Sequence, residues 1–339
     1  MIAEFRKKAY RALCCLVLIT IAMPAASQGV RCGNPDPDIS IAGCTKKIQS
    51  DSAELKSGAQ IQAAAAKLAT DYDHRGVAYA NKRLYDQAIA DYNQAISLVP
   101  KSFPIAYFNR ANAYYEQGLD DQAIADYTKA IALEPEGADP DFLLADAYNY
   151  RGNAYERNGH YDEAIADFTM AISLKPGLES PYEHRGNDYS RKALYDLAIA
   201  DFSKAISLNS RNVATYYNRA LAYQRKGLHD EAISDLTKEI SLAPNDSGAY
   251  DLRALAYERK GLQDQAIADY TQEIALNAKE IALHPVFASK HAVAYGRRGG
   301  AYEHKGAVDA AAADYRAALK LDPDMQSAKA ALTRLGAAP

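Results

Sequence analysis

Arginine and aspartate recur in this chain at a fixed separation that suits charge pairing. Seven times an arginine is followed sixteen positions later by an aspartate. A planar guanidinium binds a carboxylate through two parallel hydrogen bonds. Since the pair is present every time, we predict a ladder of structural ion pairs and no ligand site at these residues. The pairs are Arg75 and Asp91, Arg110 and Asp126, Arg151 and Asp167, Arg185 and Asp201, Arg219 and Asp235, Arg253 and Asp269, and Arg298 and Asp314.

Residue patterns for catalysis or metal binding are absent from the sequence. The seven histidines lack metal-ligand spacing such as His-Glu-x-x-His, and there is neither a Gly-x-Ser-x-Gly elbow nor a phosphate-binding glycine loop. His284 and His291 form the only local histidine pair, and we interpret them as surface residues. We therefore predict no catalytic residue, no metal and no cofactor. An enzyme ranks third among the functions considered.

The arginine–aspartate pairs belong to a 34-residue repeat. Tyrosine stands at positions 4 and 11 of every block and alanine at position 20. A period of this length indicates a solenoid of stacked units. The seven blocks, within 69–325, are 69–102, 104–137, 145–178, 179–212, 213–246, 247–280 and 292–325.

Two insertions interrupt this period. The segment 138–144 precedes the third block, and we expect Asp141 to Leu144 to lengthen its first helix. The segment 281–291 precedes the seventh block, where a repeated Glu-Ile-Ala-Leu extends the second helix by about two turns. Whether these insertions bind a partner or are tolerated length changes stays open.

Each block reads as two helices joined by a turn. Position 18 is always aspartate, and we expect it to cap the second helix by accepting a backbone N–H bond. Glycine at position 15 of five blocks, such as Gly159, suits the turn between the helices. Proline at position 32, as in Pro176, ends the second helix.

These residues resemble the tetratricopeptide repeat family. The stretches Tyr148-Asn149-Tyr150-Arg151-Gly152-Asn153-Ala154-Tyr155 and Tyr161-Asp162-Glu163-Ala164-Ile165-Ala166-Asp167-Phe168 follow the family pattern closely. The resemblance implies an all-α, right-handed superhelical solenoid of seven helix-turn-helix repeats, with a concave groove lined by the first helices. It also implies a role in holding partner proteins or peptides. A C-terminal capping helix is expected within 326–339, from Gln326 to Leu335. Self-association through an imperfect cap stays open.

The N-terminus has the layout of a secretory signal peptide over residues 1–27. Basic residues precede an apolar run of about eleven residues, which is shorter than the roughly 20 needed to span a bilayer. Cleavage near Ser27 predicts a periplasmic or secreted protein of bacterial envelope type. An uncleaved inner-membrane anchor is the alternative.

The segment 28–68 contains the cysteine pair that such cleavage would leave. Loss of Cys14 and Cys15 leaves Cys32 and Cys44, and an even pair in an exported chain favours a disulfide. The remainder of the segment is interpreted as a mixed linker. Ser40 to Ile48 resembles an isolated second helix, so we hypothesise a degenerate half-repeat that caps the array and is pinned by this disulfide.

The net charge argues against a nucleic-acid partner. It is −4 for the whole chain, and the first 27 residues carry four basic residues and one acidic residue, so −7 remains without them. No stable membrane span is expected after cleavage. We therefore expect the partner to be a protein or peptide, of unidentified sequence.

Positions 2, 5, 9 and 12 of the first helix face the groove in this family, and they vary between blocks. Asparagine amides offer donors and acceptors that can hold an extended backbone, whereas apolar residues suit an anchor side chain. The predicted function is thus a non-catalytic scaffold for a peptide or protein. The alternative is a cell-wall-associated protein that binds polysaccharide or peptidoglycan. The predicted groove residues are Phe108, Asn112, Tyr115, Asn149, Asn153, Asn187, Tyr217, Leu221 and Leu255.

Overall fold

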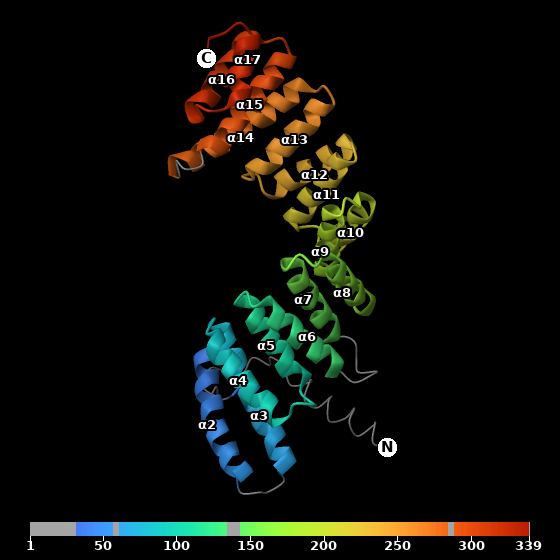
Figure 1. The fold of residues 1–339 in the computed structure, drawn as a ribbon, viewed down its shortest axis with the longest axis vertical. Coiled ribbons are helices and arrows are strands. Elements are labelled where there is room, and N and C mark those ends of the chain that lie inside the picture. Colours follow the sequence, from blue (N-terminus) through green and yellow to red (C-terminus); the bar gives the residue numbers. More distant parts are fainter. Residues whose placement is uncertain (1–31, 57–60, 134–142, 284–287, 339) are drawn as a thin grey trace. The chain divides into compact units, whose positions relative to one another are not determined.

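The computed structural model describes residues 32–56, 61–133, 143–283 and 288–338, and in these ranges it contains α-helices and no strand (Figure 1). The predicted all-α repeat architecture is thereby confirmed. The signal-peptide prediction falls on residues outside the described ranges. The chain divides into two units, Met1–Pro181 and Tyr182–Pro339, and each is considered by itself.

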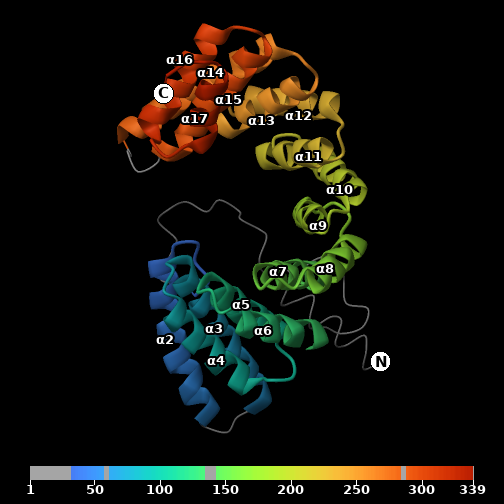
Figure 2. The ribbon, with the colours of Figure 1, turned by 45° about the horizontal axis from the view of Figure 1, so that its top comes forward.

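In the first unit, consecutive helices pack against each other in chain order. Figures 1 and 2 both show α2, α3 and α4 side by side at the blue end of the colour scale. The helices are α2 (Pro37–Lys56), α3 (Ile61–Asn81), α4 (Tyr85–Leu98), α5 (Pro104–Glu116), α6 (Asp120–Leu133), α7 (Leu144–Arg157) and α8 (Tyr161–Leu174).

The second unit continues the alternation of first and second helices and ends on a single capping helix. Ala328, Ala331 and Leu332 of that last helix pack on the final repeat, as expected for a cap. The helices are α9 (Ser180–Arg191), which begins at the boundary between the units, α10 (Tyr195–Leu208), α11 (Val213–Arg225), α12 (His229–Leu242), α13 (Ser247–Arg259), α14 (Gln263–Leu283), α15 (Ala288–His304), α16 (Val308–Leu321) and α17 (Gln326–Arg334).

Small residues allow the two helices of a repeat to approach closely. The alanine at position 20 is fully buried in all seven repeats, as at Ala164. At position 8 of the third repeat, a Cβ on Gly152 would lie 2.7 Å from the Phe168 ring, which is closer than such atoms come. Glycine is therefore required there by packing, because the position-24 aromatic ring occupies the space that a methyl group would need.

The predicted capping role of the position-18 aspartates was wrong. The residue before each second helix with a described N-cap is Leu84, His160, Leu194, Leu228 or Ala307, and none makes a side-chain cap bond. The aspartates lie inside the first turn, where they still suit the helix dipole. Five of their carboxylates instead accept bonds from position 14 of the next repeat, directly after its first helix. These contacts are Gln117 to Asp86, Asn158 to Asp121, Lys226 to Asp196, Lys260 to Asp230 and Lys305 to Asp264.

The turn between the two helices needs a left-handed residue at position 15. The five glycines there have φ between 75° and 81°. The first and fourth repeats place Arg83 (φ 59°) and Ala193 (φ 58°) in the same conformation. A side chain with a Cβ is disfavoured in this region, so these two turns are strained relative to the others.

In five repeats the second helix ends two residues before the proline at position 32. In the fourth repeat α10 ends at the same point, Leu208, although Ser210 stands at that position. In the third repeat α8 ends at Leu174, two residues before Pro176. In the sixth repeat Ala278 replaces the proline, and α14 continues to Leu283 with 21 residues where α8 has 14. The extension of two turns matches the repeated Glu-Ile-Ala-Leu. The expected lengthening of α7 falls on Asp141 and Phe142, outside the described residues; α7 itself begins at Leu144.

The arginine–aspartate ladder is present in the structure. Every position-7 arginine donates two hydrogen bonds of 2.6–2.8 Å to its aspartate, as Arg151 does to Asp167 and Arg185 to Asp201. The aspartates are only 5–7% exposed. Each guanidinium also lies 5.3–6.0 Å from the ring centroids of the position-4 and position-11 tyrosines. The invariant residues therefore serve the repeat itself.

Part of the 28–68 segment that we assigned to a linker is helical. Residues 61–68 are the first two turns of α3, and α2 packs along them. In α2, Cys44 stands where a repeat has its position-24 aromatic, and it forms the disulfide with Cys32. Lys82, directly after α3, pairs with Asp38 as a position-14 residue pairs with the preceding position 18. We call residues 32–56 the half-repeat, because α2 takes the place of a second helix without a first.

Candidate partner-binding surface

The residues predicted to bind a partner lie on first helices in both units. Four of these side chains are half-buried in the first unit, Asn149 there is buried, and four are half-buried in the second unit. Phe108, Asn112 and Tyr115 lie on α5, Asn149 and Asn153 on α7, Asn187 on α9, Tyr217 and Leu221 on α11, and Leu255 on α13.

Three aromatic rings meet on α5, α6 and α7. The Phe108 centroid lies 5.7 Å from Tyr127 and 5.8 Å from Tyr150, both edge to face, and the two tyrosines stack at 6.3 Å. Tyr127 is fully buried, which raises its pKa, and its hydroxyl donates to Asn112 Oδ1 at 2.6 Å. Tyr150 is 39% exposed. The Tyr150 ring is thus exposed to solvent, and the buried, hydrogen-bonded Tyr127 supports it from within the protein.

Asn153 carries an acceptor that this part of the structure leaves unused. Its Oδ1 is buried and has no hydrogen-bond partner among the described residues. It follows Tyr150 by three residues on α7, so the two side chains lie on one helix face. A buried acceptor without a donor costs about 1–3 kcal/mol. We call Phe108, Asn112, Tyr127, Tyr150 and Asn153 the aromatic–amide face.

The other predicted asparagines make bonds within the protein. Asn149 is buried and accepts from Ser180 at 3.4 Å. Asn187 Oδ1 accepts from Asn218 Nδ2 at 3.0 Å. The side-chain oxygens of these two asparagines thus serve contacts between neighbouring first helices.

Tyr115 is covered by an arginine from the next repeat. The Arg157 guanidinium lies 4.0 Å from the Tyr115 ring centroid and donates to the Tyr115 backbone carbonyl at 2.8 Å. Arg157 also pairs with Asp120. Tyr115 consequently joins two repeats, and Arg157 covers one face of its ring.

In the second unit the predicted residues pack on an apolar cluster. Tyr217 and Leu221 are partly buried against Leu236 and Leu252, and Leu255 is half-buried. Burial raises the pKa of Tyr217, and the neighbouring carboxylate of Glu239 adds to this effect.

Two charged features of this second surface were missed. Glu239 is 1% exposed, and burial, assisted by Asp246, raises its pKa to about 8. Asp251 on α13 forms an ion pair with Arg297 on α15. Glu239 was detectable from the sequence, because it occupies position 27, where five of the repeats have alanine. The Asp251 pairing was not detectable, because 46 residues separate the partners.

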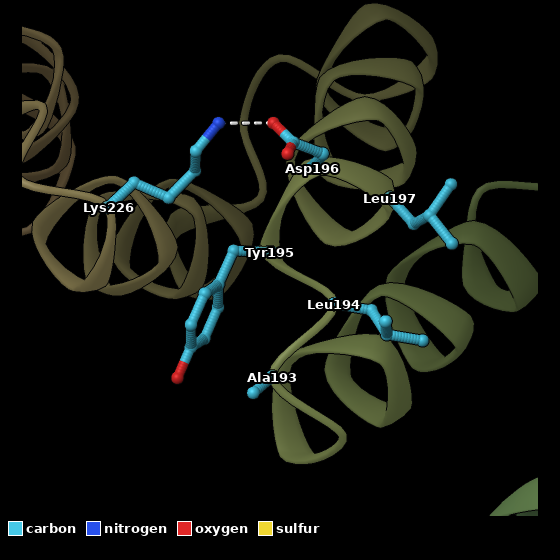
Figure 3. Close-up of a pocket in the computed structure, with 6 residues that line it drawn as sticks. All are labelled: Ala193, Leu194, Tyr195, Asp196, Leu197 and Lys226. Carbon is cyan, nitrogen blue, oxygen red and sulfur yellow. Dashed lines mark hydrogen bonds and ion pairs between the residues drawn. The ribbon is translucent and has the colours of Figure 1, made fainter.

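A surface depression lies elsewhere, at the turn between α9 and α10. Ala193, Leu194, Tyr195, Asp196, Leu197 and Lys226 line it. Figure 3 shows the Lys226 side chain reaching toward Asp196. None of the predicted binding residues contributes to this depression.

The potential metal ligands and the predicted histidine pair lie in different parts of the chain. Within the described ranges, the potential ligand atoms of Cys32, Asp71 and His74 lie within 4.8 Å of one another. Cys32 is disulfide-bonded to Cys44. His291 is 2% exposed, so its interpretation as a surface residue was wrong: the start of α15 is packed in the repeat. Its predicted companion His284 lies outside the described residues.

Three family models of the tetratricopeptide repeat match the chain. One matches residues 104–136 and 145–178, a second 76–118 and 194–227, and a third 213–246 and 292–325. The chain belongs to the tetratricopeptide repeat family. Such repeats generally form non-catalytic scaffolds for interactions between proteins.

Solved structures share the fold. The C-terminal part of a repeat-containing protein from Cytophaga hutchinsonii is 23% identical, with a TM-score of 0.65 over 76% of this chain and 98% of that one. A tetratricopeptide repeat protein from Parabacteroides merdae is 19% identical, with a TM-score of 0.50 over 79% and 98%. No curated protein matches the sequence significantly. Among the described helices, none combines the length and the apolar character that crossing a membrane requires.

Proposed function

We propose that this protein is a scaffold of the bacterial envelope that binds a peptide or an extended segment of a partner protein across its first helices. The aromatic–amide face is the main contact. The observation that carries this proposal is the combination of an exposed Tyr150 ring with the unused Asn153 acceptor beside it.

The two groups complement a polypeptide. An aromatic ring on a rigid base contributes a large contact area at little cost in side-chain entropy, and such residues often dominate the binding energy. A backbone N–H of the bound segment would donate to Asn153 Oδ1 and remove the cost of a buried unpaired acceptor. Folded repeats hold both groups in place before binding, which lowers the cost of association.

The second unit offers a surface of different character. Tyr217 and Leu221 present half-buried apolar surface, and the Asp251–Arg297 pair lies on the neighbouring first helices α13 and α15. An apolar side chain of the same or another partner would pack against Leu221. The variable residues on the first helices of each unit would then determine which partner binds. The invariant arginines, aspartates and tyrosines would not, because they bind each other within the repeats.

Export is part of the proposal. The basic stretch, apolar run and small residues of segment 1–27 support it. The mass of the protein recovered from the periplasm tests it: loss of about 27 residues is expected, whereas an intact N-terminus in the membrane fraction would favour the anchored form.

The binding proposal is tested by selecting peptides from a display library on the immobilised protein and measuring their affinity calorimetrically. Tyr150→Ala and Asn153→Ala should each weaken the selected peptides about tenfold or more, which corresponds to about 1.4 kcal/mol. Met170→Ala serves as the control, because Met170 is a comparably exposed side chain on second helix α8. Equal binding by all variants would show that the site does not lie on the aromatic–amide face. Binding to peptidoglycan fragments and to no peptide would establish the polysaccharide alternative.

A further inference from the structure

We propose that the half-repeat, once its disulfide is reduced, binds a Zn²⁺ ion through Cys32, Cys44, His74 and Asp71. This inference is independent of the partner-binding proposal. The site uses no residue of either first-helix surface.

Three of the four donor atoms already converge at the junction of α2 and α3. Cys32 Sγ lies 3.9 Å from His74 Nδ1, and the ligand atoms of Cys32, His74 and Asp71 fall within 4.8 Å of one another. Tetrahedral zinc, with sulfur at about 2.3 Å and nitrogen at about 2.0 Å, places its ligand atoms roughly 3.5–3.8 Å apart. Cys44 Sγ is bonded to Cys32 Sγ, so reduction leaves a second thiol next to the first.

Two elements hold these residues. Cys32 lies in the turn before α2 and Cys44 on α2, whereas Asp71 and His74 stand three residues apart on α3 and share a helix face. Only α2–α3 packing brings the four together, which explains why sequence spacing did not indicate a site.

Asp71 is the buried carboxylate of the site. Its side chain is fully buried, Lys47 Nζ donates to Oδ1 at 2.5 Å, and the buried carboxyl group of Asp51 is its other side-chain hydrogen-bonding neighbour. A divalent cation on Asp71 would take the place of the proton that two adjoining carboxyl groups share, while the lysine orients the carboxylate as an outer-shell partner does in metal sites.

The charges of the proposed site balance. Two thiolates offset the charge of Zn²⁺, and His74 binds as the neutral imidazole. The ammonium of Lys47 offsets the carboxylate of Asp71, and that of Lys67 offsets the neighbouring Asp51. Ser40 Oγ, 3.9 Å from Cys44 Sγ, lies where its hydroxyl donates to the thiolate.

The chemistry has two steps. A dithiol reductant breaks the S–S bond, giving two electrons and two protons to form two thiols while it becomes a disulfide itself. Zn²⁺ then binds the sulfurs and releases both thiol protons to solvent. In the oxidised protein the sulfurs lack thiolate character, so the site is absent. Either the disulfide or a bound metal ion therefore holds the two cysteines of the half-repeat together.

Titration with Co²⁺, a coloured substitute for zinc, tests the proposal. The full chain with Cys14→Ser and Cys15→Ser keeps Cys32 and Cys44 as its only thiols, and a phosphine keeps them reduced. The reduced protein should bind one Co²⁺ with thiolate charge-transfer and tetrahedral ligand-field bands that Zn²⁺ removes, and the oxidised protein should show none. His74→Gln and Asp71→Asn should each weaken binding at least tenfold, and His304→Gln on α15 should leave it unchanged.

Three results would overturn the inference. The first is the absence of stoichiometric binding by the reduced chain. The second is unchanged affinity in His74→Gln, which would show that the two thiols alone chelate the ion. The third concerns loss of structure. Reduction could release α2, which faster hydrogen exchange of its amides would report. If Zn²⁺ then fails to restore the protection of these amides, the site is refuted.

Discussion

Arg75 on α3 donates a hydrogen bond to Thr45 Oγ1 on α2 at 3.2 Å. Arg151 makes the same bond to Thr128, and Arg253 to Thr237, each across the junction to the preceding repeat. The position-7 arginine therefore does two things: it binds its own aspartate and ties its repeat to the one before. Thr45 takes the place of a position-25 residue, so the half-repeat is closed by the same contact as a complete unit.

Replacing Arg151 with lysine should destabilise the third repeat. Lysine keeps the charge but cannot make the two parallel bonds to Asp167 together with the bond to Thr128. We expect a loss of about 2 kcal/mol, because Asp167 stays buried with one donor fewer. Urea unfolding measures this, with the exposed Arg211→Lys as the control. Equal losses for the two variants would contradict a structural role for the ladder.

The disulfide should protect α2 from local opening. Serine at both Cys32 and Cys44 removes a cross-link with a sequence separation of 12, worth about 3 kcal/mol in the chain-entropy model. Hydrogen exchange of α2 amides, without added metal, should accelerate accordingly, and α11 amides in the other unit provide the reference. If α2 exchanges at the original rate, packing on α3 holds it without the cross-link.

Ala193→Gly should stabilise the fourth repeat. Ala193 has φ 58° at the turn position where five repeats have glycine. Glycine relieves the unfavourable left-handed conformation, and we expect a gain of about 1 kcal/mol. Gly159→Ala is the matched control. No atom lies within 4 Å of its added methyl group, so the conformational cost alone should destabilise it by a similar amount. Thermal unfolding of both variants measures this, and a gain in each would refute the explanation.

Glu239 should make stability depend on pH. Burial, with Asp246 nearby, raises its folded pKa to about 8 from an ordinary value of 4.5. Between these values the unfolded chain has released a proton that the folded chain retains, so the free energy of unfolding falls as pH rises from about 4.5 to 8 and then levels off. Glu239→Gln should remove this decline. Buried Asp71 and Asp73, with pKa values raised to about 6, contribute equally to both proteins up to that pH. Denaturant unfolding at several pH values measures the free energy of unfolding of both proteins. If the two free energies change by the same amount between pH 6 and 8, the assignment to Glu239 is contradicted.

Features that lie within a single repeat were predictable from the sequence. The sixteen-residue spacing identified the ion pairs, and the repeated Glu-Ile-Ala-Leu predicted the long α14. Contacts between repeats were not predictable from one block. Asn187 was taken for a ligand group because its partner Asn218 lies 31 residues away. The position-18 aspartates were taken for caps because their neighbouring lysines and amides also come from the next repeat.

The arginine contact to the preceding repeat gives the array a direction. Second helices such as α6 and α12 are tied by the arginine of the following repeat, and α2 is also cross-linked. At the other end α16 is followed by α17 alone, whose Arg334 binds Glu303 through a largely exposed side chain. We therefore expect heat or force to release α17 before α2. The array would open at the helix that only side-chain packing and an exposed ion pair hold, and stay closed at the helix that a covalent bond holds.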